Sequence, residues 1–296
     1  MNKNQYIALG IVLLSVTFVC GICCGYFLGS RTEERNQQTE ETQSSISISS
    51  SDTSAEQTET SESESPETSE SESETTESEA TSSSDTHSQW LEDGFNYLAI
   101  GNSITQHGIS SYWWNEVGMA ASDDEHDYFH LVLKHLEENK GKAKGVAYNF
   151  YIWETQSHDR DEALELLDQY LSPDLDLVTV QLGENAGDLT TFQKDYISLL
   201  QYIRSKAPDA RILVLGDFWI SENRDELKAA AAAEANVEFV SLDGIASNDE
   251  YYCGLGTVVY DAEGNEHIVE HDGVARHPGD NGMRAIADRI IGTLDQ

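Results

Sequence analysis

The chain has 296 residues and a formal net charge of −37, with 54 acidic and 17 basic side chains. A charge this negative argues against nucleic acid and anionic lipid surfaces as binding partners. Three of the 4 cysteines lie close together between positions 20 and 24. The remaining one, Cys253, therefore has no second cysteine in the rest of the chain with which to form a disulfide. The cysteines thus do not indicate whether the protein works in an oxidising or a reducing compartment.

An apolar run without charged side chains extends over residues 6–28 and follows a short N-terminal tail, residues 1–5. The run is long enough to cross a bilayer as a helix, and no small-residue cleavage pattern stands near its end. We therefore predict an uncleaved transmembrane signal anchor, with a cleaved signal peptide as the alternative. Lys3 before the run and Arg31 after it leave the orientation undecided by the positive-inside rule.

Residues 29–90 are rich in Ser, Thr and Glu, and 16 acidic residues stand against 2 basic ones between positions 31 and 90. Such a segment has too few large apolar residues to offset the entropy of ordering the chain. We predict a disordered acidic linker here. Because Ser/Thr-rich stalks are typical of cell exteriors, we expect a single-pass protein of the cell membrane with its folded part outside the cell. An intracellular acidic linker is the alternative.

Residues 91–296 alternate between apolar runs and amphipathic segments, which predicts a single α/β domain with helices on both faces of a parallel sheet. The expected strands are 96–100, 145–151, 175–182, 211–218 and 237–242. The expected helices are 128–139, 159–171, 191–206, 221–235 and a last one that runs from about 280 to 294. A β-hairpin is expected across 257–260 and 266–270.

Polar residues stand where several of these segments end. The first strand ends in Gly101 and Asn102, and Ser103 comes next, at the position where open α/β sheets place their chemistry. A histidine within reach makes such a hydroxyl a nucleophile; without one, the serine is an ordinary helix cap. Asn185 follows the third strand, and His277 lies just before the last helix.

These residues resemble three sequence blocks of the SGNH hydrolases, also called GDSL esterases. Gly101-Asn102-Ser103-Ile104-Thr105 resembles the first block, with Asn102 where the family usually has Asp. Gly183-Glu184-Asn185 resembles the third block, and His277-Pro278 resembles the last. The resemblance extends over residues 96–291 and implies a three-layer α/β/α fold with a flavodoxin-like parallel sheet.

The resemblance implies Ser103 as the nucleophile, His277 as its base, and the Asn185 amide with the Ser103 N–H as donors of an oxyanion hole. No glycine ends the second strand, although the family uses one as a further donor there. The family's acid stands three residues before the histidine, where this chain has Val274. We expect Asp272 to orient His277 instead, with a Ser–His dyad held by a backbone carbonyl as the alternative.

Aromatic residues gather near the predicted strand ends, and they either pack the core or form a platform for sugar rings. The aromatic residues concerned are Tyr112, Trp113, Trp114, Tyr151, Trp153 and Trp219. We name Trp113 and Trp153 as candidate substrate contacts, together with Glu154, which could contact a sugar hydroxyl. No group of histidines and acidic residues has a metal-ligand spacing, so neither a metal nor a cofactor is predicted.

Together these features predict a membrane-anchored, extracytoplasmic serine esterase that removes an acetyl or another acyl group from a cell-surface carbohydrate. The same residues would serve an O-acyltransferase, in which a sugar rather than water accepts the acyl group. A non-catalytic glycan-binding module on this fold is the alternative from another functional class. The acidic composition and the absence of an apolar lid-like helix argue against a lipid-directed esterase.

Overall fold

The computed structural model describes residues 89–221 and 223–296. The expected anchor at 6–28, the tail at 1–5 and the linker at 29–90, except for its last two residues, lie outside the described residues. Among the described helices, none has both the length and the apolarity that a membrane crossing requires. Trp90 is buried and its indole Nε1 donates to the Tyr170 carbonyl at 2.9 Å, so the packed core includes the chain from this residue onward.

A five-stranded sheet forms the centre of the fold, and its strand order is β2-β1-β3-β4-β5. The strands are β1 (Phe95–Gly101), β2 (Ala143–Asn149), β3 (Leu177–Gln181), β4 (Arg211–Leu215) and β5 (Glu238–Val240). Every neighbouring pair is parallel, as predicted. This order is the flavodoxin-like one, whose winding reverses between β1 and β3, and ligands bind such sheets at the carboxyl ends of those two strands.

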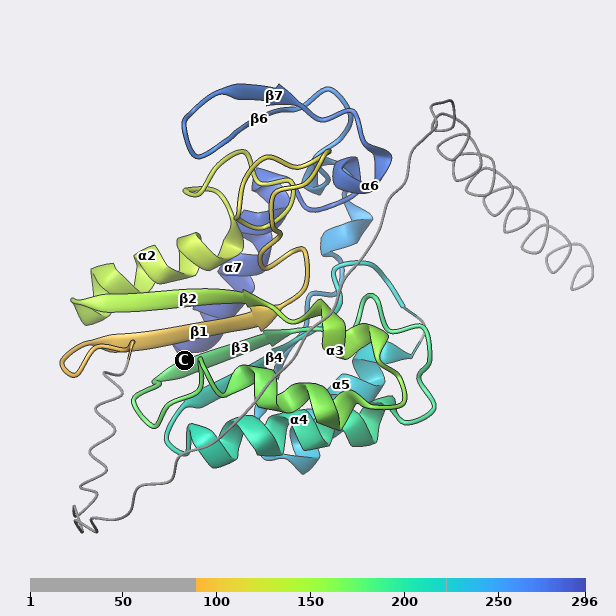
Figure 1. Cartoon of the computed structure of the whole chain (residues 1–296). Coiled ribbons are helices and arrows are strands. Elements are labelled where there is room, and N and C mark those ends of the chain that lie inside the picture. Colours follow the sequence, from red (N-terminus) through yellow and green to blue (C-terminus); the bar gives the residue numbers. More distant parts are fainter. Residues whose placement is uncertain (1–88, 222) are drawn as a thin grey trace, which may run out of the picture. The chain divides into compact units, whose positions relative to one another are not determined.

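Helices cover both faces of the sheet, which gives three layers (Figure 1). The helices are α2 (Tyr128–Lys140), α3 (Tyr151–Thr155), α4 (Phe192–Lys206), α5 (Arg224–Glu234), α6 (Asp272–Ala275) and α7 (Asp280–Leu294). The shorter elements are the 3-10 helices η1 (Arg160–Leu167), η2 (Ile245–Ser247) and η3 (Asp249–Tyr251), and the strands β6 (Val258–Tyr260) and β7 (Glu266–Ile268) of an antiparallel hairpin. α2 and α7 lie on one face, and α3, α4 and α5 lie on the other.

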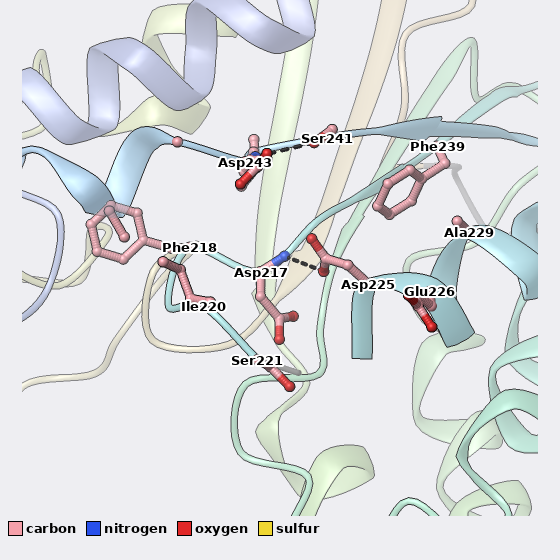
Figure 2. A pocket seen from close by; sticks show the side chains of 13 residues that line it. Asp217, Phe218, Ile220, Ser221, Asp225, Glu226, Ala229, Phe239, Ser241 and Asp243 are labelled. Atoms are coloured by element: carbon pink, nitrogen blue, oxygen red, sulfur yellow. Dashed lines mark hydrogen bonds between the residues drawn. The ribbon is translucent and has the colours of Figure 1, made fainter. Parts of the chain in front are cut away.

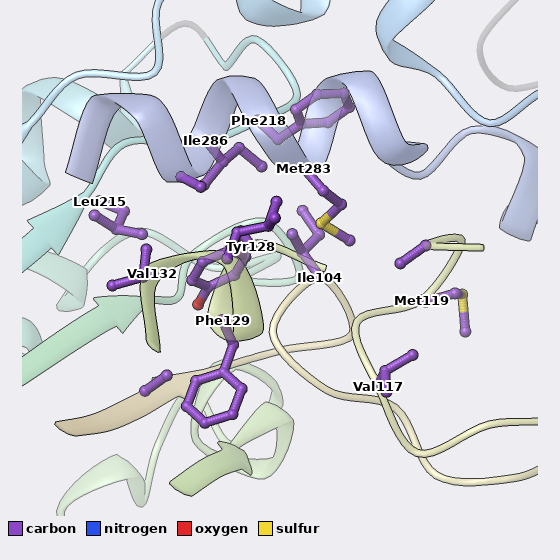
Figure 3. Packing of buried hydrophobic residues seen from close by; sticks show 14 of the residues in the cluster. Ile104, Val117, Met119, Tyr128, Phe129, Val132, Leu215, Phe218, Met283 and Ile286 are labelled. Carbon is purple, nitrogen blue, oxygen red and sulfur yellow. The ribbon is translucent and has the colours of Figure 1, made fainter. Parts of the chain in front are cut away.

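Two apolar clusters fill the spaces between the sheet and its helices. Tyr97 and Ala99 of β1 belong to the cluster with α2 and α7, whereas Leu98 and Ile100 belong to the cluster with α4 and α5. They alternate because successive side chains of a strand point to opposite faces of the sheet. Figure 3 shows the first cluster, in which Met283 of α7 lies among side chains from α2 and from the loop after β1.

The strands predicted at 211–218 and 237–242 are shorter in the structure, where β4 ends at Leu215 and β5 at Val240. Two further predicted elements differ for reasons that the contacts show. The predicted strand 145–151 ends at Asn149, because the side-chain oxygen of Asn149 accepts the Tyr151 N–H at 3.0 Å and turns the chain into α3. The predicted helix 159–171 is a 3-10 helix over 160–167. Arg160 at its start is buried and donates to the backbone carbonyl of Trp153 at 3.2 Å, so tertiary contacts rather than helix propensity fix this segment.

Candidate active site

The loop after β1 presents Ser103 at the carboxyl edge of the sheet. The Asn102 carbonyl accepts the Thr105 N–H at 3.0 Å, which closes a tight turn around the serine. A Cβ on Gly101 would lie 1.8 Å from Thr105 Oγ1 and 2.9 Å from the Gln181 carbonyl oxygen. Only glycine therefore fits where the strand passes into the turn.

His277 reaches Ser103 from the loop between α6 and α7. Its Nε2 lies 2.8 Å from Ser103 Oγ, and its Nδ1 lies 2.7 Å from the carbonyl oxygen of Gly273. Because a carbonyl only accepts, Nδ1 carries the ring proton and Nε2 is left to accept the serine hydroxyl. Trp219 packs edge-on against the imidazole with ring centroids 4.9 Å apart, which restricts the ring further.

The backbone carbonyl of Gly273 takes the place for which Asp272 was predicted. Asp272 opens α6 and its side chain is exposed, while the helical turn directs the next residue's carbonyl toward His277. The expectation that Asp272 orients the imidazole is therefore not met, and the alternative, a Ser–His dyad held by the main chain, describes the contacts.

Burial lowers the pKa of His277 to about 4. The bond to Gly273 opposes this shift, and electrostatic repulsion from the neighbouring His107 and His271 adds to it. The imidazole is consequently neutral at pH 7, the state in which Nε2 accepts a proton.

Asn185 follows β3 and lines the same cavity as Ser103. Its Nδ2 donates one hydrogen to Glu154 Oε2 at 2.7 Å, which leaves a second amide hydrogen for another acceptor. In the described part of the chain, the Ser103 N–H has no acceptor. Both groups predicted as oxyanion donors thus keep a hydrogen available beside the serine.

The three predicted substrate contacts are wrong. Trp113 and Trp153 have 0% of their surface exposed and Glu154 has 1%, so none presents a face to a bound molecule. Trp153 packs against Phe192 and Tyr196 of α4. Position near a predicted strand end could not distinguish these core residues from the aromatic residues that do reach the cavity.

A cavity of about 470 Å³ opens above the Ser103–His277 pair. Its other lining residues are His107, Tyr112, Met119, Asn149, Tyr151, Asn185, His271, Gly273 and Val274. Among the described residues, the wall contains no carboxylate, lysine or arginine, although the chain as a whole is strongly acidic. Tyr112 stacks on His271 with centroids 4.5 Å apart and is 37% exposed, and Tyr151 is 49% exposed. Their position near a predicted strand end indicated these two tyrosines as candidate cavity residues, whereas no sequence signal indicated Asn149 as one.

A second cavity of about 400 Å³ lies beside α5 and is lined by Asp217, Asp225, Glu226 and Asp243 among others (Figure 2). The Asp217 carboxylate is already bound, by the Lys228 ammonium at 2.7 Å and by Arg224 at 2.5 Å. Throughout residues 89–221 and 223–296, no three His, Cys, Asp or Glu side chains are grouped as a metal site requires.

No protein-family model and no curated protein sequence matches the chain. Among solved structures, a two-domain esterase (CEX) active on acetylated mannans matches at 18% identity and a TM-score of 0.42, over 68% of this chain and 48% of that one. This chain thus spans about half the length of that esterase. A putative GDSL-like lipase from Bacteroides uniformis matches at 16% identity and a TM-score of 0.46, over 69% and 97% of the two chains. Phospholipase A1 from Streptomyces albidoflavus matches at 15% identity and a TM-score of 0.43, over 67% and 99%.

The three sequence blocks that resemble those of the SGNH hydrolases lie close together in the structure. The flavodoxin-like strand order places the first and third blocks side by side after β1 and β3, and the last block brings its histidine to the serine. In strand order, in the placement of these blocks and in the contact between Ser103 and His277, the chain resembles the SGNH hydrolases, or GDSL esterases.

Proposed function

We propose that the chain is a serine carboxylic-ester hydrolase with Ser103 as nucleophile and His277 as general base. The observation that carries the proposal is the 2.8 Å contact between Ser103 Oγ and His277 Nε2. Nε2 takes the hydroxyl proton while Oγ forms a bond to the ester carbonyl carbon. The Asn185 amide and the Ser103 N–H donate to the oxyanion that develops, an interaction worth about 2.7–4 kcal/mol per donor.

The intermediate then collapses and the bond between the acyl carbon and the alcohol oxygen breaks. The proton on Nε2 passes to the leaving alcohol, which leaves an acyl group on Ser103 and a neutral His277. In the second half-reaction a water molecule gives a proton to Nε2 and attacks the acyl carbon. The bond between the acyl carbon and Oγ then breaks, the acid leaves, and the proton returns from Nε2 to Oγ. The Gly273 carbonyl keeps the imidazole in the required tautomer throughout.

The proposed substrate is an acylated carbohydrate at a cell surface. The described cavity wall has no carboxylate, lysine or arginine, which suits a neutral substrate, and the exposed rings of Tyr112 and Tyr151 offer flat apolar faces beside polar groups. The apolar run at 6–28 supports a membrane anchor, and the Ser/Thr/Glu-rich segment that follows supports display outside the cell.

The pH dependence follows from the lowered pKa of His277. The base works only when neutral, so a pKa of about 4 extends activity to acidic pH. We expect kcat/KM for a neutral ester to stay level from neutral pH down to about pH 5 and to fall through a single step near pH 4. A rate profile recorded at constant ionic strength checks this, and a step near 6.5, the ordinary value for histidine, would contradict it.

A fluorophosphonate tests the proposed nucleophile directly. Ser103 Oγ displaces fluoride to form an oxygen–phosphorus bond, His277 accepts the proton, and peptide mass spectrometry locates the adduct. We expect one adduct, on Ser103, and none after His277→Ala. Ser110 in the same loop is the internal control, because no histidine contact is found for its hydroxyl in the described structure. A wild-type protein that stays unlabelled, or that is labelled elsewhere, would remove the basis of the proposal.

A further inference from the structure

Glu154 is a buried carboxylate at the centre of the loops that carry the candidate site. Its oxygens accept Asn185 Nδ2 at 2.7 Å, Asn102 Nδ2 at 3.1 Å and the Gly183 N–H at 2.5 Å. The Asn185 N–H lies farther away, at 3.5 Å. Asn102 precedes the serine after β1, while Gly183 and Asn185 follow β3. One carboxylate thus joins the two loops on either side of the reversal in the sheet.

We infer that Glu154 is a positioning residue, which orients the Asn185 amide for the oxyanion; this inference rests on the proposed function. An ionised carboxylate only accepts hydrogen bonds, so it fixes Nδ2, and not Oδ1, as the atom of Asn185 that faces it. The second hydrogen on Nδ2 is then held in one direction, on a residue that lines the cavity with Ser103. A carboxylate does not touch the substrate here, because Glu154 is only 1% exposed.

The same carboxylate explains why residue 102 is an amide. The Asn102 Nδ2 donates to Glu154 at 3.1 Å and to Glu184 at 2.9 Å, while its Oδ1 accepts the Ile104 N–H at 3.1 Å. An aspartate at this position would bring another carboxyl group against those of Glu154 and Glu184 in a buried place and would lose the two bonds that Asn102 Nδ2 donates, which is unfavourable. The Glu154 carboxylate therefore holds the amides of Asn102 and Asn185 in one arrangement.

The backbone of α3 is held independently of the Glu154 carboxylate. Arg160 donates to the carbonyls of Trp153 at 3.2 Å and of Glu154 at 3.4 Å, and it pairs with Asp195 at 2.8 Å. The Trp153 side chain is fully buried next to it. A change confined to the end of the Glu154 side chain thus leaves these anchors in place, which separates positioning of Asn185 from support of the fold.

A double-mutant cycle tests the inference. We expect Asn185→Ala to lower kcat for an acetyl ester about 100- to 1,000-fold, and Glu154→Gln to lower it at least about 10-fold. In both, kcat and kcat/KM should fall equally, because the lost interaction is made only in the transition state. If Glu154 acts through Asn185, the double variant should be no more than about threefold slower than Asn185→Ala alone. Multiplying effects in an active enzyme would overturn the inference and leave the proposed function intact.

Glu184→Gln is the matched control. The Glu184 carboxylate accepts hydrogen bonds from Asn102, Gln181 and the Phe218 N–H, and none from the Asn185 amide in the described structure, so its effect should multiply with that of Asn185→Ala. An inactive wild-type protein would contradict both the proposed function and this inference.

The NMR signals of the Asn185 side-chain amide, identified by their loss in Asn185→Ala, give a readout besides activity. We expect two well-separated proton signals in the wild type and faster exchange of these protons with solvent in Glu154→Gln. If Glu154→Gln does not fold, Glu154→Asp takes its place; if neither folds, the carboxylate is a requirement of the fold and the inference fails.

Discussion

Replacing Ser103 with alanine is expected to lower kcat for a chromogenic acetyl ester by on the order of 10⁴-fold or more, close to the uncatalysed rate. The variant keeps the cavity and the oxyanion donors but has no oxygen to form the acyl intermediate. Because Ser103 is half-buried and its backbone carbonyl already accepts the Met119 N–H at 2.8 Å, losing one hydroxyl should leave the fold intact.

The control is Ser110→Ala in the neighbouring turn, which should keep wild-type kcat. Circular dichroism and thermal unfolding of both variants establish that they fold. Equal release of acid by wild-type protein and Ser103→Ala would show that the serine takes no part in hydrolysis.

Replacing Lys228 with methionine is expected to cost about 3 kcal/mol of unfolding free energy, at the lower end of the range for breaking a buried ion pair. Lys228 is fully buried, and its Nζ lies 2.7 Å from Asp217 Oδ1 and 3.2 Å from the Leu182 carbonyl. Methionine keeps most of the volume but leaves the Asp217 carboxylate with Arg224 as its cationic partner, which limits the loss.

Urea titration at pH 8 measures this loss, with Lys206→Met as the matched control. Lys206 pairs with Asp168 on the surface, where solvent screens the pair, so its replacement should cost far less. A Lys228→Met protein as stable as the wild type would show that the buried charges do not depend on one another.

The same network affects Glu184, which accepts Asn102 Nδ2 at 2.9 Å and feels the charge of Asp217. Burial raises the pKa of Glu184 to about 7, the charges of Asp217 and Glu154 raise it as well, and Lys228 lowers it. Glu184 accepts the Phe218 N–H at 3.0 Å and Gln181 Nε2 at 2.7 Å, which ties the loop after β4 to the end of β3. Lys228 thus partly offsets the burial that raises the pKa of Glu184, a side chain that contacts Asn102.

Much of the fold could be predicted because its elements are strongly patterned. The apolar run before Gly101 and the run from Leu177 to Gln181 are the short buried strands that a parallel sheet requires, and each ends where a polar block begins. Helix α7 was equally clear, since Pro278 and Gly279 precede a long apolar periodicity. Pairing order is a tertiary property, and only the likeness of the sequence blocks to a known family indicated it.

The parts of the site that could not be predicted depend on backbone atoms and on burial. The carbonyl that orients His277 belongs to Gly273. Because every residue has a backbone carbonyl, the residue type at position 273 could not predict this contact. Trp153 and Tyr151 stand two positions apart in one short helix, yet one is fully buried and the other is about half exposed. Which ring faces the core is decided by α4, whose Phe192 and Tyr196 lie far along the chain.

The central claim is that Ser103 and His277 act as one catalytic unit, and a comparison of the single and double alanine variants tests it most directly. Residues that act together are strongly non-additive, so His277→Ala and the double variant should both retain about the residual kcat of Ser103→Ala. Rates of acetyl-ester hydrolysis from the four proteins at pH 7 decide the matter. If His277→Ala keeps near-wild-type kcat, or if the two losses multiply in the double variant, the 2.8 Å contact is not a catalytic one.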